Sequence, residues 1–257
     1  GAFADGRRLA RLETLMKGRI VLLDTLNDRP AAALMVDGKL QDLLIDPPED
    51  GPPGIGAILR GVCDLPLKGP GGMMLRLPDG QSALLRQGKG LSPGQPLLVQ
   101  VTGMGADGKA TPVNTRLLFK SRYAIVTPDA PGLNIARSIK DEEERDRLLE
   151  IAQEGMAGAP EGFGLILRSA SNEVDDEALA EDIAAMRELA EAVTADLEGE
   201  PELLVDAPDA HMTAWRDWAS PEPDEVISRD GAFADLGVLE EIDAALQDAV
   251  LLTAGAS

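Results

Sequence analysis

Residues 55–119 decide the central fold; they read IGAILRGVCDLPLKGPGGMMLRLPDGQSALLRQGKGLSPGQPLLVQVTGMGADGKATPVNTRLLF. Short apolar runs alternate here with turn clusters such as Pro78-Asp79-Gly80 and the glycine-rich stretch 103–108. Five of the runs have the length and composition of β-strands: 57–63, 72–77, 81–86, 96–102 and 110–117. Five short strands at this spacing predict a small β-barrel.

The segment before the barrel predicts a β-hairpin followed by a linker. A β-rich run covers 19–24, and the runs 31–36 and 40–45 are joined by Asp37-Gly38. Asp-Gly between apolar runs is a strong hairpin signal, because both residues tolerate a positive φ. The sequence DPPEDGPPG at 46–54 then interrupts regular structure and predicts a domain boundary.

The segment after the barrel mixes strands and helices. Strands are expected at 123–127, 164–169 and 202–205, and helices at 141–156, 175–197 and 235–251. The helix 175–197 carries one apolar stripe that includes Leu179, Ile183 and Val193, and its acidic residues fall elsewhere. These carboxylates indicate a solvated helix face rather than a metal site. Together the patterns predict an α+β fold with several domains.

Charge is strongly sorted along the chain. Residues 59–140 contain 11 Lys and Arg against 4 Asp and Glu, whereas residues 141–257 contain 6 Arg against 32 Asp and Glu. The formal net charge is −21, so the chain as a whole repels polyanions. The basic segment predicts either one face that meets a polyanion or a chance excess within an acidic, soluble surface.

Composition excludes several kinds of site. The chain has one cysteine, Cys63, and one histidine, His211, which excludes a disulfide framework and a Cys/His zinc site. Cys63 is expected to be a buried apolar residue, and His211 to lie in a loop with a structural role or none. No apolar run is long enough to span a membrane, and the cysteine usage is typical of a cytoplasmic protein.

Several motifs occur as an ordered set along most of the chain. Met16-Lys17-Gly18-Arg19-Ile20 and the Asp37-Gly38 hairpin are followed by GQPLLVQV at 94–101, SRYAIVTP at 121–128 and GLILRSA at 164–170. In this order and at these spacings the motifs resemble those of the bacterial ribonuclease E/G family. The resemblance covers roughly 16–257, and residues 1–15 are expected to be an N-terminal extension.

The resemblance implies a domain division and a reaction. It implies an RNase H-like unit split between 16–54 and 201–257, an OB-fold RNA-binding barrel at 55–119 inserted in it, and a 5′-sensor domain at 120–200. In this family a DNase I-like domain holds magnesium on an aspartate pair, and the intact enzyme, a possible homo-oligomer, cleaves single-stranded RNA in RNA processing or decay. This domain is expected to begin where the chain stops, at Ser257. We therefore expect no catalytic residue and no cofactor within the chain.

The same resemblance assigns candidate substrate-binding residues to the sensor domain. Arg168 and Ser169 match an arginine and a hydroxyl residue that bind a 5′-monophosphate. A guanidinium can give two charge-assisted hydrogen bonds to phosphate oxygens, and a serine hydroxyl adds a third donor. Ile125 matches a contact beside the terminal nucleotide, and Arg137 matches the first of two neighbouring arginines. Without the resemblance, Arg168 is most simply a surface arginine paired with one of the many carboxylates; the resemblance favours the phosphate contact.

Some positions depart from the family pattern. Ser121 stands where the family commonly has glycine, and Ser138 replaces the second arginine, which predicts weaker phosphate binding. In the barrel, Met74 and Leu84 fall near positions where the family often stacks bases on phenylalanine, a contact that contributes about 1–3 kcal/mol per base. These two residues are either RNA-facing or part of the barrel core. Lys109 matches a basic contact, so binding is expected to be mainly electrostatic.

Three functions remain open at this point. The chain is the RNA-binding and 5′-sensing portion of a ribonuclease E/G-type endoribonuclease, or it is a non-catalytic RNA-binding protein that has lost the nuclease domain. A reading frame that continues past Ser257 into an aspartate-bearing segment separates these two. The third function is a protein-interaction scaffold built on the acidic half, which predicts no affinity for RNA.

Overall fold

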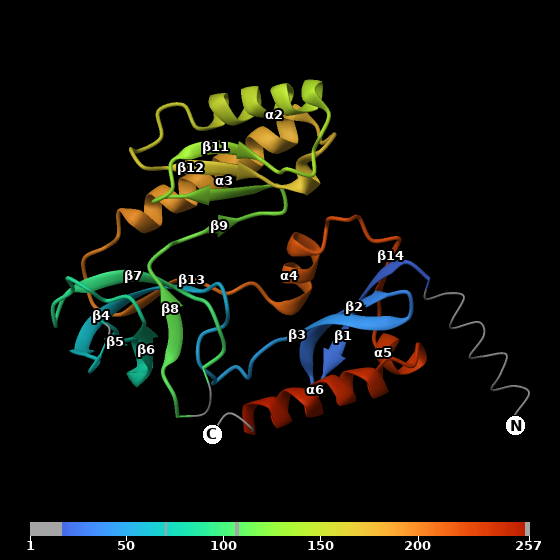
Figure 1. The fold of residues 1–257 in the computed structure, drawn as a ribbon, viewed down its shortest axis with the longest axis horizontal. Helices are drawn as coiled ribbons and strands as arrows, with labels where there is room; N and C mark the ends of the chain where they lie inside the picture. Colours follow the sequence, from blue (N-terminus) through green and yellow to red (C-terminus); the bar gives the residue numbers. More distant parts are fainter. Residues whose placement is uncertain (1–16, 70, 106–107, 255–257) are drawn as a thin grey trace, which may run out of the picture. The chain divides into compact units, whose positions relative to one another are not determined.

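A computed structural model describes residues 17–69, 71–105 and 108–254, so the expected extension 1–15 lies outside the described residues. The fold is α+β and divides into two compact units, one from Glu49 to Pro208 and one built from both ends of the chain, up to Pro48 and from Asp209 (Figure 1). Over the described ranges, no helix is both long and apolar enough to cross a membrane.

The predicted barrel is confirmed. Its strands are β4 (Ile58–Pro66), β5 (Met73–Arg76), β6 (Ser82–Leu85), β7 (Pro96–Val101) and β8 (Thr111–Asn114), with the short 3-10 helix η1 (Pro78–Gly80) between β5 and β6. The hydrogen-bonded order β4-β5-β6-β8-β7 closes through a β4–β7 pairing, which is consistent with an OB-fold. Cys63 is 1% exposed in the barrel core, as expected.

A buried arginine joins the barrel to the segment that follows helix α3 (Asp176–Thr194). Arg60 lies on β4, and its guanidinium donates to the carbonyl oxygens of Asp196 and Glu200 at 2.8 and 2.9 Å. The same group pairs with the carboxylates of Asp196 and Glu202 at 3.1 and 2.8 Å. Strand β13 (Glu202–Val205) pairs with β4 on the outside of the ring. This segment, expected to belong with the C-terminal part, therefore packs on the barrel.

A second layer of the same unit is a four-stranded sheet covered by two helices. The strand order is β11 (Gly132–Ile135), β12 (Gly164–Leu167), β10 (Ala124–Thr127) and β9 (Phe119–Lys120), and the helices are α2 (Glu142–Gly155) and α3. Alternate strand residues and apolar helix residues share one core: Ala124, Val126, Leu165, Leu167, Leu148, Ile151, Leu179 and Ile183. The sequence pattern predicts β10, β12 and both helices, whereas β9 and β11 were not expected.

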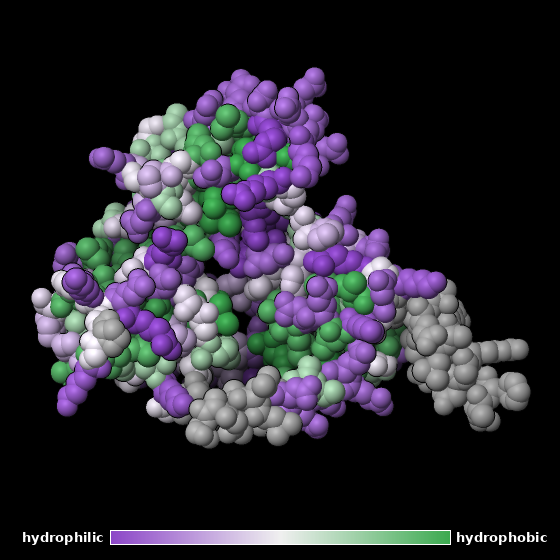
Figure 2. Space-filling model, viewed as in Figure 1, coloured by the Kyte–Doolittle hydropathy of each residue, from purple (hydrophilic) through white to green (hydrophobic). Residues whose placement is uncertain are grey.

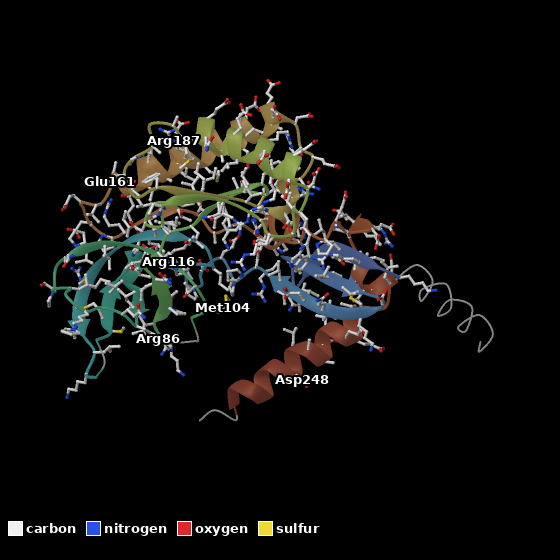
Figure 3. The ribbon with its side chains drawn as sticks, turned by 45° about the horizontal axis from the view of Figure 1, so that its top comes forward. Arg86, Met104, Arg116, Glu161, Arg187 and Asp248 are labelled. Atoms are coloured by element: carbon white, nitrogen blue, oxygen red, sulfur yellow. The ribbon has the colours of Figure 1, made fainter. Side chains whose placement is uncertain are left out.

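Charged side chains fix the ends of these helices and cover their outer faces. Asp141 caps α2 by accepting from the backbone N–H of Glu143 at 3.3 Å. Arg187 on α3, labelled in Figure 3, donates to the carbonyl oxygens of Gly155 and Ala157 at the end of α2. The surface over α2 is hydrophilic (Figure 2). Most acidic residues of this half therefore belong to a solvated face, as the sequence pattern indicated.

The unit built from both chain ends is a four-stranded sheet between helices. Strands β1 (Arg19–Leu26), β2 (Arg29–Val36) and β3 (Lys39–Ile45) form a meander, and β14 (Glu225–Ser228) pairs parallel to β1. The predicted hairpin turn is confirmed, with φ of 49° at Asp37 and 78° at Gly38. One sheet face packs on α5 (Ala232–Asp235) and α6 (Leu239–Ala254), and the other packs on α4 (Ala210–Asp217).

The expectation of a loop around His211 is wrong. Asp209 accepts from the backbone N–H of Met212 at 2.7 Å and so caps α4, on which His211 lies. The Nε2 atom of His211 lies 2.9 Å from the carbonyl oxygen of Asp24 and 3.0 Å from that of Ala31. A nitrogen between two acceptors must carry the proton, so this histidine has a structural role.

Asp24 ties β1 to the start of α5 and makes this unit sensitive to acid. Burial opposes ionisation, but the backbone N–H groups of Phe233, Thr25 and Gly231 and the charge of Arg229 outweigh it, so the pKa of Asp24 lies below its ordinary 3.8. Because this pKa is lowered on folding, the ionised carboxylate stabilises the fold. Its contribution to stability is complete above about pH 3.8 and is lost as pH falls through the pKa of the folded state.

We expect Asp24→Asn to lower the free energy of unfolding of the unit by about 1 kcal/mol at pH 7, because a neutral amide accepts these N–H groups less well than a carboxylate. The difference from the original chain should shrink below pH 3.5, where the carboxylate is protonated too. Urea denaturation at pH 7 and pH 3 measures both values. A penalty of equal size at both pH values would contradict the assigned role of the charge.

Candidate nucleic-acid interface

The face of the β11-β12-β10-β9 sheet opposite the helices carries the first candidate residue, Ile125. Its neighbours Ala124 and Val126 point into the core beneath α2 and α3, so the pleat places Ile125 on the opposite face. There it lies opposite Ile166 on one side and Lys120 on the other. Ile125 and Ile166 are both half-buried. The sheet thus offers an apolar strip next to the residues that follow β12.

Arg168 directly follows β12, and its main chain is held at three points. Its N–H donates to the carbonyl oxygen of Tyr123 at 2.7 Å. Its own carbonyl oxygen accepts from the N–H and the hydroxyl of Ser171 at 2.9 and 2.6 Å, which closes the 3-10 turn η2 (Ser169–Ser171). The guanidinium donates from Nη1 to the carbonyl oxygen of Ser121 at 2.9 Å. The main chain and the guanidinium of Arg168 are therefore both held in place, and the guanidinium lies at the β9–β10 turn.

Ser121 organises that turn. Its hydroxyl oxygen accepts from the N–H groups of Ala124 at 2.9 Å and Tyr123 at 3.3 Å, and it donates to the carboxylate of Asp182 on α3. Burial raises the pKa of Asp182, while the hydrogen bonds from Ser121 and from the backbone N–H of Tyr123 act in the opposite direction. Ser121 thus supports Arg168 through its carbonyl group, and its hydroxyl is used within the fold.

Ser169 and Ser138 form a pair of hydroxyl groups. Strands β11 and β12 are parallel neighbours, with Ile135 opposite Leu167, so the residues that follow each strand emerge at the same edge of the sheet. The two Oγ atoms lie 2.5 Å apart, and either one can be the donor. Ser138 is exposed and Ser169 half-buried. Sequence matching found both positions but could not show that they touch.

The turn that carries Ser138 is held by α2. Arg145 donates from Nη1 to the carbonyl oxygens of Ala136 and Ile139 at 2.9 and 2.8 Å. The N–H of Ala136 donates to the carbonyl oxygen of Leu167 at 2.9 Å, which extends the β11–β12 pairing. Arg137 lies on this turn with an exposed side chain. Arg145 and Asp182 also support the site, and no sequence pattern identifies them, because their partners are defined only by the tertiary fold.

A second candidate surface is the outer face of the barrel. Met74 on β5 lies opposite Leu84 on β6, and Leu84 lies opposite Pro112 on β8. Met73, Leu75, Ala83 and Leu85 fill the core, so Met74 and Leu84 point outward and are half-exposed. The interpretation of these two residues as barrel core is therefore wrong.

Basic and apolar side chains surround this row. Arg76 and Arg86, at the ends of β5 and β6, are exposed. Lys109 is exposed in the loop between β7 and β8, the fourth and fifth strands of the ring, and Met104 in the same loop is 55% exposed. Figure 3 shows Arg86 and Met104 at the barrel. In OB-folds the second and third strands and the loop between the fourth and fifth contact oligonucleotides.

The candidate residues thus fall into two groups within one compact unit. One group, the Arg168 cluster, contains Arg168, which donates to the Ser121 carbonyl oxygen, and Ser169, which pairs with Ser138. Ile125 and Arg137 lie on the adjoining strand and turn and belong to the same cluster. Lys109 belongs to the barrel. Among the residues that the structure describes, no group of three or more His, Cys, Asp or Glu side chains could hold a metal ion. The described residues therefore do not fit a magnesium site, and we assign none to them.

Comparison with known proteins agrees with the resemblance seen in the motifs. Residues 119–235 match the model of the Ribonuclease E/G family. A stretch of 103 residues is 33% identical to Ribonuclease E of Synechocystis sp. and 32% identical to Ribonuclease E of Nostoc sp.. Each match covers 40% of this chain and 15% of the relative.

These matches support a known family for one segment of the chain. The chain spans about 15% of the length of the curated relatives it matches, and the matched segment contains the sheet, both helices and the Arg168 cluster. The expected resemblance is confirmed for this segment, which matches the Ribonuclease E/G family. The barrel strands β4 to β8 lie outside the residues that the family model matches.

Proposed function

We propose that this chain is the RNA-binding and 5′-monophosphate-sensing portion of a ribonuclease E/G-type endoribonuclease that acts on single-stranded RNA in the cytoplasm. The observation that carries the proposal is the Arg168 cluster. A guanidinium held by main-chain contacts, two adjacent hydroxyl groups and an apolar strip at Ile125 meet at one sheet edge. These groups suit a phosphate with a nucleotide attached to it.

The chemistry of the cluster fits a terminal phosphate better than an internal one. A 5′-monophosphate carries close to two negative charges and three terminal oxygens, whereas an internal phosphodiester carries one charge and two such oxygens. A guanidinium and neighbouring hydroxyl donors gain more hydrogen bonds and more charge attraction from the former. A 5′-hydroxyl end has neither the charge nor the terminal oxygens of a phosphate. The cluster therefore supports selection by the chemical state of the 5′ end.

In this proposal the barrel binds the body of the RNA strand. Met74, Leu84 and Pro112 give an aliphatic surface without a ring to stack on, and Arg76, Arg86 and Lys109 supply positive charge around it. We also propose that the unit built from both chain ends is the split RNase H-like domain, and that cleavage and magnesium binding belong to the intact enzyme. In this chain the residues bind and orient RNA.

Lys109→Ala should reveal an electrostatic contact that does not depend on the 5′ end. For the unmodified chain, three to five phosphate contacts imply a slope of log K against log salt of about −2 to −3.5, and removal of one contact should reduce it by about 0.7. Fluorescence anisotropy with single-stranded RNA of one sequence, bearing either a 5′-phosphate or a 5′-hydroxyl, measures affinity and slope between 50 and 300 mM salt.

The matched control is Lys39→Ala, which changes the net charge equally at an exposed lysine of the other unit. Lys109→Ala should weaken both RNAs alike, and Lys39→Ala should weaken neither. If the unmodified chain binds no RNA at the lowest salt, the proposed function is wrong and a protein-interaction role is favoured instead. Equal effects of the two lysine variants would remove Lys109 from the interface.

A further inference from the structure

Ser138 is an exposed residue of the turn that follows β11, and the structure gives this serine a partner of its own. The Ser138 and Ser169 hydroxyl oxygens lie 2.5 Å apart, at the ends of two parallel strands and next to Arg168. We propose that Ser138 is a phosphate ligand that determines specificity in this chain, acting with Ser169 as a paired hydroxyl clamp on the 5′-terminal phosphate. This inference rests on the proposed function of the same site.

The hydroxyl pair has an unused capacity to donate. Each serine hydroxyl has one hydrogen and two acceptor lone pairs. With one hydroxyl donating to the other, one of the two hydrogens is used inside the pair. A phosphate dianion accepts strongly from several donors at once, so both hydroxyl groups can rotate to donate to its oxygens. Rotation of a hydroxyl requires no movement of the main chain.

The main chain around the Ser138–Ser169 pair is ordered before a ligand binds. Arg145 holds the Ala136 and Ile139 carbonyl groups of the turn, and Ile139 itself is 5% exposed. On the other side, Ser171 holds the carbonyl group of Arg168, beside Ser169. Binding groups that are already ordered lose less conformational entropy when a ligand arrives. The pair is therefore placed for a ligand at the exposed side of Ser138.

A neutral ligand and a charged ligand affect the salt dependence of RNA binding differently. A hydroxyl adds hydrogen-bond energy without neutralising a charge, so it releases no counterions from the RNA. Loss of Ser138 should therefore lower the affinity for 5′-phosphorylated RNA by the same factor at every salt concentration. Loss of a charged ligand should lower the affinity most at low salt and also reduce the slope.

The test uses the full chain and two RNAs of one single-stranded sequence, with a 5′-phosphate or a 5′-hydroxyl, in anisotropy titrations at several salt concentrations. Ser138→Ala should weaken binding of the phosphorylated RNA about fivefold to tenfold, with an unchanged salt slope and no effect on the hydroxyl RNA. Ser138→Thr, which keeps the hydroxyl, should retain most of the affinity. Ser228→Ala, at an exposed serine of the other unit, is the control and should change nothing.

A double-mutant cycle separates a ligand from a positioning residue. If Ser138 contacts phosphate, Ser138→Ala should still reduce affinity severalfold in a chain that already carries Ser169→Ala. If Ser138 merely orients Ser169, its removal should have no further effect there, and that result would overturn the assignment as a ligand. An unchanged denaturation midpoint shows that the variants remain folded.

Arg168→Ala distinguishes failure of this inference from failure of the proposed function. If Arg168→Ala removes the preference for the 5′-phosphate while Ser138→Ala leaves the preference intact, the sensor assignment stands and the role of Ser138 is wrong. If the unmodified chain binds both RNAs equally well, the proposed 5′-sensing function is wrong, and the inference about Ser138 is wrong with it.

Discussion

Gly164→Ala is expected to destabilise the larger unit by about 3 kcal/mol or more, because there is no space for a methyl group at this position. A Cβ atom there would lie 1.9 Å from the carbonyl oxygen of Ala130, 2.8 Å from the hydroxyl of Thr127 and 2.9 Å from the carbonyl oxygen of Gly132. The Thr127 hydroxyl also donates to the Ala130 oxygen at 2.8 Å. Relief of the clash would require the loop before β11 to move.

The control is Gly61→Ala in the barrel. A Cβ atom at Gly61 would lie 3.4 Å from its nearest neighbour, the carbonyl oxygen of Arg76, which is ordinary van der Waals contact. Urea denaturation followed by circular dichroism should give a large loss of stability for Gly164→Ala and a small change for Gly61→Ala. A wild-type midpoint for Gly164→Ala would show that the loop yields easily. Because β12 leads into Arg168, we also expect Gly164→Ala to bind 5′-phosphorylated RNA poorly.

Much of the fold was predictable where local signals agree. The five barrel strands are separated by proline and glycine turns, and Asp37-Gly38 has the positive φ values that its turn requires. The long helices have clear apolar stripes. The missed elements lack such signals: β9 has two residues, and β11 has four, with Gly132 and Asn134 among them. Pairing with β12, rather than local propensity, makes β11 a strand.

The omission of β11 explains why the hydroxyl pair could not be anticipated. Ser138 and Ser169 are 31 residues apart, and they meet because β11 and β12 are parallel neighbours that end at one edge of the sheet. Asp182 is a similar case. Its helix pattern indicates a solvated carboxylate, whereas the fold places it against Ser121. A side chain that supports a site from a neighbouring element leaves no periodic pattern in the sequence.

Arg168→Ala is expected to remove the preference for 5′-phosphorylated RNA. A charge-assisted hydrogen bond contributes about 1.5–3 kcal/mol, which corresponds to roughly a 10-fold to 150-fold loss of affinity for the phosphorylated strand. Affinity for the 5′-hydroxyl strand should hardly change, because that end has no phosphate for the guanidinium to contact. Anisotropy titration of both RNAs at 100 mM salt measures the two losses, and the denaturation midpoint checks the loss of the contact with Ser121.

Arg168→Lys is the matched variant, because it keeps the charge and removes the planar fork. Its preference for the 5′-phosphate should fall between those of the original chain and Arg168→Ala if two parallel hydrogen bonds matter, and it should equal the original if charge alone matters. The second ionisation of a phosphate monoester has a pKa of about 6, so the preference of the original chain should grow as pH rises from 5.5 to 7.5. The 5′-hydroxyl strand should show no such change. Equal losses for both strands on replacing Arg168 would mean that the guanidinium supports the β9–β10 turn and does not recognise the end of the RNA.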